Sequence, residues 1–129
     1  MSSDGKLYFS SVTKDDAGSY YCLVTRPMAD STVQGGKLST PIRLNIIESI
    51  GSEQEPDIVN GFPKVFPSSP KVGDNLRIEC IAWGTALTGS LEYSWSKDGG
   101  VLPAEATQDD HKRVLNIPNV QLMHGGIYR

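Results

Sequence analysis

Short runs of alternating apolar and polar residues recur along this chain, and each run predicts a half-buried β-strand. In the run "NLRIECIAW", which begins at residue 75, four residues share one face: Leu76, Ile78, Cys80 and Ala82. Residues 91–97 repeat the pattern, with Leu91, Tyr93 and Trp95 on one face. Segments rich in Gly, Pro and Asp separate such runs, as expected of turns. The pattern predicts an all-β fold.

The first 46 residues contain three further runs. Leu7 and Phe9 share one face of a strand predicted over 6–10, and the polar segment "TKDDAGS" that follows reads as a turn. Residues 20–25 form a second predicted strand, and residues 38–46 a third, whose proline suits a sheet edge or a bulge.

An internal repeat links the two ends of the chain. Five residues of the early segment match five of the late segment at one constant offset, without gaps: Leu7, Phe9, Val12, Gly18 and Tyr20 fall on Leu115, Ile117, Val120, Gly126 and Tyr128. A period of about 100 residues is the size of a whole β-sandwich domain.

The repeat carries the spacing of an immunoglobulin-like sandwich. Asp16, Gly18, Tyr20 and Cys22 follow D-x-G-x-Y-x-C, which in such a fold marks the turn into the late strand that holds the second inter-sheet cysteine. Trp95 follows Cys80 at the spacing at which the indole packs on the disulfide. The core and tyrosine-corner positions are therefore Trp95, Tyr20, Tyr128 and Asp16. We predict immunoglobulin-like domains of I-set type.

Three segments follow from this pattern. Residues 1–46 read as the late strands of one domain, residues 47–61 as an acidic, solvated linker, and residues 62–129 as the early and middle part of a second domain. We expect both domains to be truncated, the second just before its second cysteine.

The chain has two cysteines, Cys22 and Cys80, and one disulfide between them is the simplest expectation. The repeat argues against it, because the two belong to different predicted domains. Shifted by the same offset, Cys22 maps just after Arg129. We therefore expect both to be structural half-cystines with partners outside the chain, that of Cys22 before Met1 and that of Cys80 just beyond Arg129.

Charge and motifs exclude several functions. The net charge of −3 provides no basic field for nucleic acid, and no apolar run approaches the length that spans a bilayer. Asp15–Asp16 and Asp109–Asp110 read as solvated turns rather than a catalytic pair. His111 and His124 lack partners at metal spacing. His124 reads as an exposed turn histidine where the first repeat has Asp16, which predicts a looser second turn. We expect no enzyme activity, cofactor, metal or small-molecule substrate.

The chain resembles neural cell-adhesion immunoglobulin domains, most closely the contactin family. The segment "GKLYFSSVTKDDAGSYYCLVT" is similar to the end of the second contactin immunoglobulin domain and "GKLSTPIRL" to its closing strand. "EQEPDIVNGFPKVFPSSPKVGDNLRIECIAWG" and "VLNIPNVQLMHGGIY" resemble the linker and the third domain. The resemblance implies a cell-surface adhesion module of the axon-guidance type, with homophilic or heterophilic protein partners. It implies membrane attachment, including any lipid anchor, only through parts outside this chain.

Other classes stay open at this point. They are an ectodomain piece of a neuroglian-like or Down-syndrome-type adhesion molecule, a receptor kinase or phosphatase ectodomain, a secreted hemolin-like immune protein, and an intracellular muscle-type array. Cysteines at inter-sheet positions favour the oxidising exterior over the muscle-type array.

Overall fold

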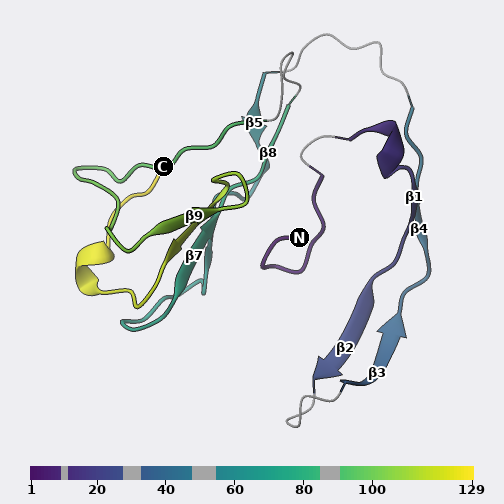
Figure 1. Ribbon diagram of the computed structural model, residues 1–129, viewed down its shortest axis with the longest axis horizontal. Coiled ribbons are helices and arrows are strands. Elements are labelled where there is room, and N and C mark those ends of the chain that lie inside the picture. The colour runs from purple at the N-terminus through teal and green to yellow at the C-terminus, as the bar shows by residue number, and fades with distance from the viewer. Residues whose placement is uncertain (10–11, 28–32, 48–54, 85–90) are drawn as a thin grey trace. The chain divides into compact units, whose positions relative to one another are not determined.

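The computed structural model describes residues 1–9, 12–27, 33–47, 55–84 and 91–129 (Figure 1). Its described elements are β-strands and two short 3₁₀ helices, which confirms the all-β prediction. The chain forms two compact units. The larger unit consists of Met1–Ser11 with Ser52–Arg129, and the smaller unit of Val12–Gly51. The described residues 1–9 thus pack with the larger unit, whereas the sequence grouped them with the residues that follow.

A four-stranded antiparallel sheet is the centre of the larger unit. Its order is β6-β7-β10-β9, with β6 at Lys64–Phe66, β7 at Leu76–Glu79, β10 at Val114–Ile117 and β9 at Thr107–Asp109. The register pairs Ile78 with both Val65 and Leu115. Because directly paired residues share a face, this row is the inner face of the sheet. The next row, Lys64–Glu79–Val114–Asp109, lies on the outer face.

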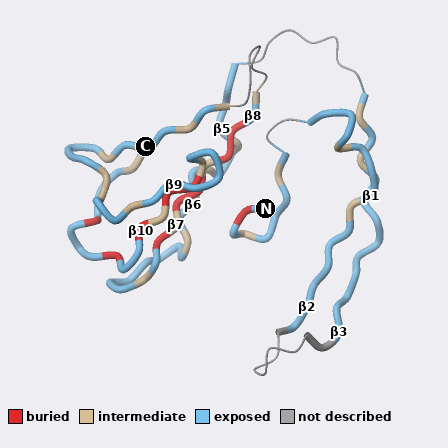
Figure 2. The backbone as a smooth tube through the Cα atoms, viewed as in Figure 1, coloured by how far each residue is buried: buried red, intermediate tan, exposed pale blue. Residues whose placement is uncertain are grey.

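The core lies against the inner face. Five buried residues form it: Leu76, Ile78, Leu115, Ile117 and Val120. Leu115 and Ile117 have no exposed surface, and full burial of such a side chain contributes about 1.5–3 kcal/mol. Trp95, Leu102, Ala106 and Tyr128 pack against this cluster from partly buried positions. In Figure 2 the buried residues gather along β7 and β10.

Two smaller ladders complete the larger unit. Strand β5 (Asp57–Ile58) pairs with β8 (Ala82–Trp83). Ser96 and Arg129 exchange two backbone hydrogen bonds of 2.8 and 3.0 Å, and the amide of Asp98 donates to the carbonyl of Ile127 at 2.9 Å. The second 3₁₀ helix, η2 (Leu122–His124), lies just before residues 127–129 of this ladder in the sequence.

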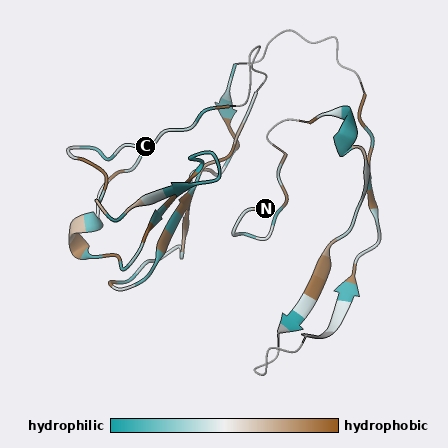
Figure 3. Cartoon of the chain, viewed as in Figure 1, coloured by the Kyte–Doolittle hydropathy of each residue, from teal (hydrophilic) through white to brown (hydrophobic). Residues whose placement is uncertain are grey.

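The smaller unit contains the helix η1 (Lys14–Asp16) and two two-stranded ladders. Strand β1 (Gly18–Tyr20) pairs with β4 (Ile42–Leu44), and β2 (Leu23–Pro27) pairs with β3 (Val33–Leu38). Its strands expose large apolar side chains, including Leu23, Val24 and Ile42 at 60–67%. Figure 3 shows the hydrophobic stretch on β2. No described residue of this unit is buried.

Several strand predictions need correction. Residues 6–9 form no strand, and Leu7 is 54% exposed, because the chain turns at residues 3–5 and the ring of Tyr8 then packs against Phe62 instead of the segment pairing in a sheet. The strand predicted over 20–25 is interrupted at residues 21–22, and the one predicted over 38–46 is shorter. Residues 91–95 alternate between half-buried and exposed, as the pattern predicts, although they are outside the named strands. Residues 85–89 of the turn expected at "GTALTG" and residues 48–54 of the linker lie outside the described residues, while linker residues Asp57–Ile58 form β5.

Candidate functional site

Two equivalent tyrosine hydrogen bonds mark the repeated turns. The hydroxyl of Tyr20 donates to the carbonyl oxygen of Asp16 at 2.6 Å, and the hydroxyl of Tyr128 donates to that of His124 at 2.7 Å. Each bond reaches back four residues to the end of a 3₁₀ helix, η1 or η2. The two turns are therefore built in the same way in both units.

The side chains of Asp16 and His124 each accept a hydrogen bond from the backbone amide three residues earlier. The carboxylate of Asp16 accepts from the amide and hydroxyl of Thr13, at 2.7 and 3.0 Å. The Nδ1 of His124 accepts from the amide of Gln121 at 3.1 Å. This acceptor role requires the ring proton on Nε2, which lies 2.8 Å from Oε1 of Glu105.

The expectation that His124 is an exposed residue in a looser turn is wrong. His124 is only 7% exposed, because its ring is held between the amide of Gln121 and the carboxylate of Glu105. An imidazole nitrogen here replaces the carboxylate oxygen of the first repeat. The sequence carried no sign of Glu105, which lies far from His124 along the chain.

The predicted residues Cys80, Trp95 and Tyr128 line one cavity of about 540 Å³ in the larger unit. The indole of Trp95 donates to the carbonyl of Lys112 at 2.8 Å, which holds the ring beside the core. Burial raises the pKa of the Cys80 thiol, and the nearby charge of Arg113 only partly offsets this. Such a thiol is a poor nucleophile, which suits a structural cysteine better than a reactive one.

Cys22 lies apart from these residues, in the smaller unit, and is exposed. Its amide donates to the hydroxyl of Ser39 at 2.9 Å, and its carbonyl accepts from the amide of Ser39 at 2.8 Å. Both cysteines are free in the structure. The structure thus brings three of the predicted site residues together in the larger unit and places Cys22, Asp16 and Tyr20 in the smaller one.

A strained turn lies between β9 and β10. Asp110, His111 and Lys112 have successive φ angles of 52°, 56° and 66°, a region that residues with a Cβ rarely adopt. Arg113 fastens the turn, since its Nε donates to Asp110 at 3.0 Å and its Nη1 reaches the carbonyl of Cys80 at 3.4 Å. This contact lowers the pKa of Asp110.

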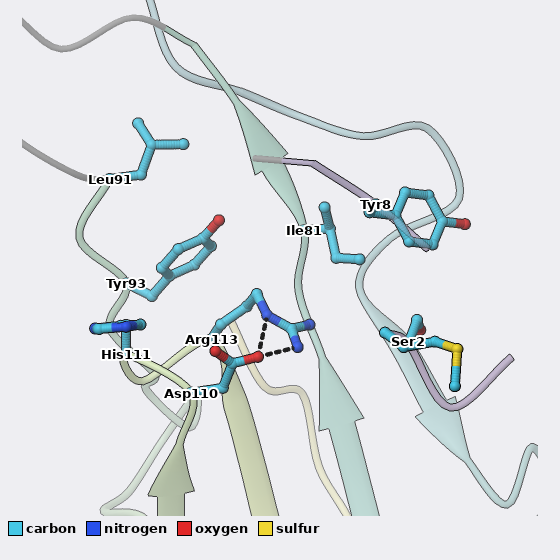
Figure 4. Close-up of a pocket in the computed structure, with 9 residues that line it drawn as sticks. Ser2, Tyr8, Ile81, Leu91, Tyr93, Asp110, His111 and Arg113 are labelled. Atoms are coloured by element: carbon cyan, nitrogen blue, oxygen red, sulfur yellow. Dashed lines mark hydrogen bonds and ion pairs between the residues drawn. The ribbon is translucent and has the colours of Figure 1, made fainter. Parts of the chain in front are cut away.

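The strained turn forms one wall of a second cavity, of about 280 Å³ (Figure 4). The Asp110–Arg113 pair lies at its centre, with Tyr93 and His111 on one side and Ser2 and Tyr8 on the other. The guanidinium of Arg113 is paired with the carboxylate of Asp110, so it is not free to select an anion.

Neither a metal centre nor a membrane span is found in the part of the chain that the structure describes. No group of three or more His, Cys, Asp or Glu side chains there is placed to hold a metal ion. No helix among those residues is long and apolar enough to cross a bilayer.

Comparison with known proteins gives one consistent result. No family model matches the chain. It is 33% identical to contactin rig-6 of Caenorhabditis elegans over 132 aligned residues, covering 100% of this chain and 10% of the relative. It is 33% identical to contactin of Drosophila melanogaster over 99% of the chain and 9% of the relative. It is 34% identical to contactin-5 of Mus musculus over 96% of the chain and 11% of the relative.

The chain thus spans about a tenth of the length of the curated relatives it matches. The match runs through both units, and the alternative families considered from the sequence are not favoured. The predicted resemblance is confirmed, and the chain belongs to the contactin family of immunoglobulin-superfamily cell-surface proteins.

Proposed function

We propose that this chain serves as an extracellular recognition module that makes adhesive protein–protein contacts at the cell surface, without catalysis. The observation that carries the proposal is the match to contactins along the whole chain.

Features of the structure support a binding role. The smaller unit presents apolar strand residues, such as Leu23 and Ile42, and the larger unit exposes Leu122 at 88% and Met123 at 73%. Where such side chains form one contiguous patch, they mark a surface at which a protein meets another protein. In the two cavities, the indole of Trp95 is bonded to a backbone carbonyl and the guanidinium of Arg113 to the carboxylate of Asp110, which favours a structural role for these groups.

The cysteines belong to the same proposal. In an oxidising exterior, Cys80 would be one half of the inter-sheet disulfide of the larger unit, and Cys22 one half of the bond in the other domain. Attachment to the plasma membrane, by a lipid anchor or otherwise, would come from the rest of the protein.

The experiment is an aggregation and cell-binding assay. Fluorescent beads coated with the chain are mixed with each other and, separately, with neural cells, in the presence or absence of soluble chain. We expect either bead clusters or bead-coated cells, and we expect soluble chain to compete with both. Beads coated with the heat-denatured chain are the matched control. Binding equal to that control, in both formats, would refute the adhesive role.

A further inference from the structure

The outer face of the four-stranded sheet contains a buried charge that strand alternation does not predict. Glu79 follows the core residue Ile78 in β7, so its side chain points to the face opposite the core. Such a position is expected to meet water. In the structure Glu79 has no exposed surface, and Val114, its partner in the register, has none either.

Residues 1–9 cover this carboxylate. The hydroxyls of Ser2 and Ser3 both donate to it, as does the amide of Ser3, at 3.2 Å from each oxygen. On the sheet side, Nε of Arg77 donates to Oε1 at 2.6 Å. A buried carboxylate is costly unless hydrogen bonds and an opposite charge compensate it, and here four donors do so.

The next contacts extend along the same segment. Oδ2 of Asp4 lies 2.8 Å from Nζ of Lys64. Lys64 lies on β6 and is the register partner of Glu79 on β7. The ring of Tyr8 meets that of Phe62 edge-on, with centroids 5.4 Å apart and planes at 88°. Lys64 also lies over the Phe62 ring, 4.8 Å from its centroid. The hydroxyls of the two serines, the carboxylate of Asp4 and the ring of Tyr8 therefore each meet a complementary group of the sheet or of Phe62 beside it.

The segment is also organised by its own bonds. The amide of Ser2 donates to the carbonyl of Lys6 at 2.9 Å, and the amide of Gly5 to that of Ser2 at 3.0 Å. Gly5 has a φ of +79°, which glycine adopts at no steric cost. The amide of Lys6 and the hydroxyl of Tyr8 both donate to Asp4. A turn that is ordered before it binds loses less entropy when it docks.

We propose that the outer face of the sheet, at Phe62, Lys64, Arg77 and Glu79, is a recognition site for a hydroxyl-bearing Ser-Ser-Asp turn, with residues 2–8 of this chain as its ligand. Glu79 selects hydroxyl and amide donors, Lys64 selects the acidic residue of the turn, and Phe62 selects an aromatic ring four residues later. In the structure the chain's own segment fills the site. A separate peptide with the same turn can take its place when that segment is disabled. The inference does not depend on the adhesive role.

The test uses the full chain and a synthetic peptide. The peptide has the sequence of residues 1–9, MSSDGKLYF, with a fluorophore at its C-terminus. The receptor is a chain in which the resident turn is disabled by Ser2→Ala, Ser3→Ala and Asp4→Asn together. Anisotropy is expected to show saturable binding to this variant. Binding to the wild-type chain is expected to be weaker, because the tethered segment competes at a high effective concentration.

Matched variants identify the contacts. Glu79→Gln in the disabled chain is expected to lower the affinity for the peptide by about tenfold, which is the effect of losing one hydrogen bond to a charged group. Ser69→Ala, an exposed serine with no bond to the segment, should leave affinity unchanged. Replacing both serines of the peptide by alanine leaves the folded chain unchanged, and this peptide should lose affinity to the same extent.

Three outcomes would overturn the proposal. They are absence of saturable binding to the disabled chain, equal binding of the serine-to-alanine peptide, and equal binding to the wild-type and disabled chains. The circular dichroism spectrum of the Glu79→Gln chain distinguishes lost recognition from lost folding. If that variant is unfolded, the decision falls to the peptide variants alone.

Discussion

The hydroxyl of Tyr128 donates to the carbonyl oxygen of His124 at 2.7 Å, and Tyr20 makes the same bond to Asp16 in the other unit. Tyr128 also packs against the core cluster, so its bond joins the turn at η2 to the sheet. Burial, followed by the charge of Glu105, raises the pKa of this hydroxyl, so it stays a donor well above neutral pH.

Tyr128→Phe removes that donor and leaves the ring in place. The free energy of unfolding is expected to fall by about 1 kcal/mol, because the carbonyl of His124 loses a partner in a half-buried place. Urea unfolding followed by tryptophan fluorescence measures it. Tyr21→Phe, at a residue that is 54% exposed, is the control and should change stability very little. Equal effects of the two variants would contradict the role given to the bond.

His124→Ala removes the acceptor for the amide of Gln121 and leaves that donor unsatisfied. We expect a loss of about 1–2 kcal/mol in the free energy of unfolding. His124→Asp restores the acceptor used in the first repeat but places a second carboxylate beside Glu105, so only part of the loss should return. Adding Glu105→Gln to the aspartate variant should recover more. A stable His124→Ala protein would show that the ring is not needed for the turn.

The sequence predicted most of the larger unit because its signals are local. The alternation of Leu76, Ile78 and Ala82, and the repeat that ends at Tyr128, indicated the strands and the turn directly. The surroundings of His124 and Glu79 could not be predicted in this way. Glu105 lies far from His124 in sequence, and Ser2 is 77 residues from Glu79. Such partners depend on tertiary packing, which no periodic pattern encodes.

The strained turn between β9 and β10 predicts an unusual gain from glycine. Lys112 has a φ of 66°, and its side chain is exposed. Lys112→Gly removes the steric cost of that conformation and should stabilise the protein by roughly 0.5–1 kcal/mol. Lys71→Gly, at an exposed residue without a positive φ, should instead destabilise it. Thermal unfolding of the two variants decides the point, and a loss of stability in both would show that the turn is unstrained.

Acid should release residues 1–9 before the sheet unfolds. Burial opposes the charge on Glu79, but Arg77, Ser2 and Ser3 outweigh it and lower its pKa to about 2, from an ordinary value of 4.5. Asp4 is lowered to a pKa of about 2, chiefly by its hydrogen bond to Lys64. A carboxyl group whose pKa is lowered by folding contributes its full stabilisation at pH values above its unfolded pKa. That stabilisation is lost as the pH falls toward the lowered pKa of the folded state.

The release of residues 1–9 is measured by amide hydrogen exchange at Ser3 and Gly5. Protection, corrected for the intrinsic pH dependence of exchange, is expected to hold above about pH 4.5 and to fall between there and about pH 2. Val59, whose amide donates to the carbonyl of Ile81, is the internal control. Protection of Ser3 that is constant across this range would mean that the two carboxylates do not hold the segment.

We propose that the two units, in the oxidising environment outside the cell, each have their own inter-sheet disulfide, in which Cys22 and Cys80 are bonded to cysteines outside this chain. Disulfide mapping by mass spectrometry of the whole protein, isolated from the cell surface under alkylating conditions, tests it most directly. We predict that Cys22 and Cys80 are both oxidised and appear in two separate cross-linked peptide pairs. A bond between Cys22 and Cys80, or alkylated free thiols at both, would contradict the account.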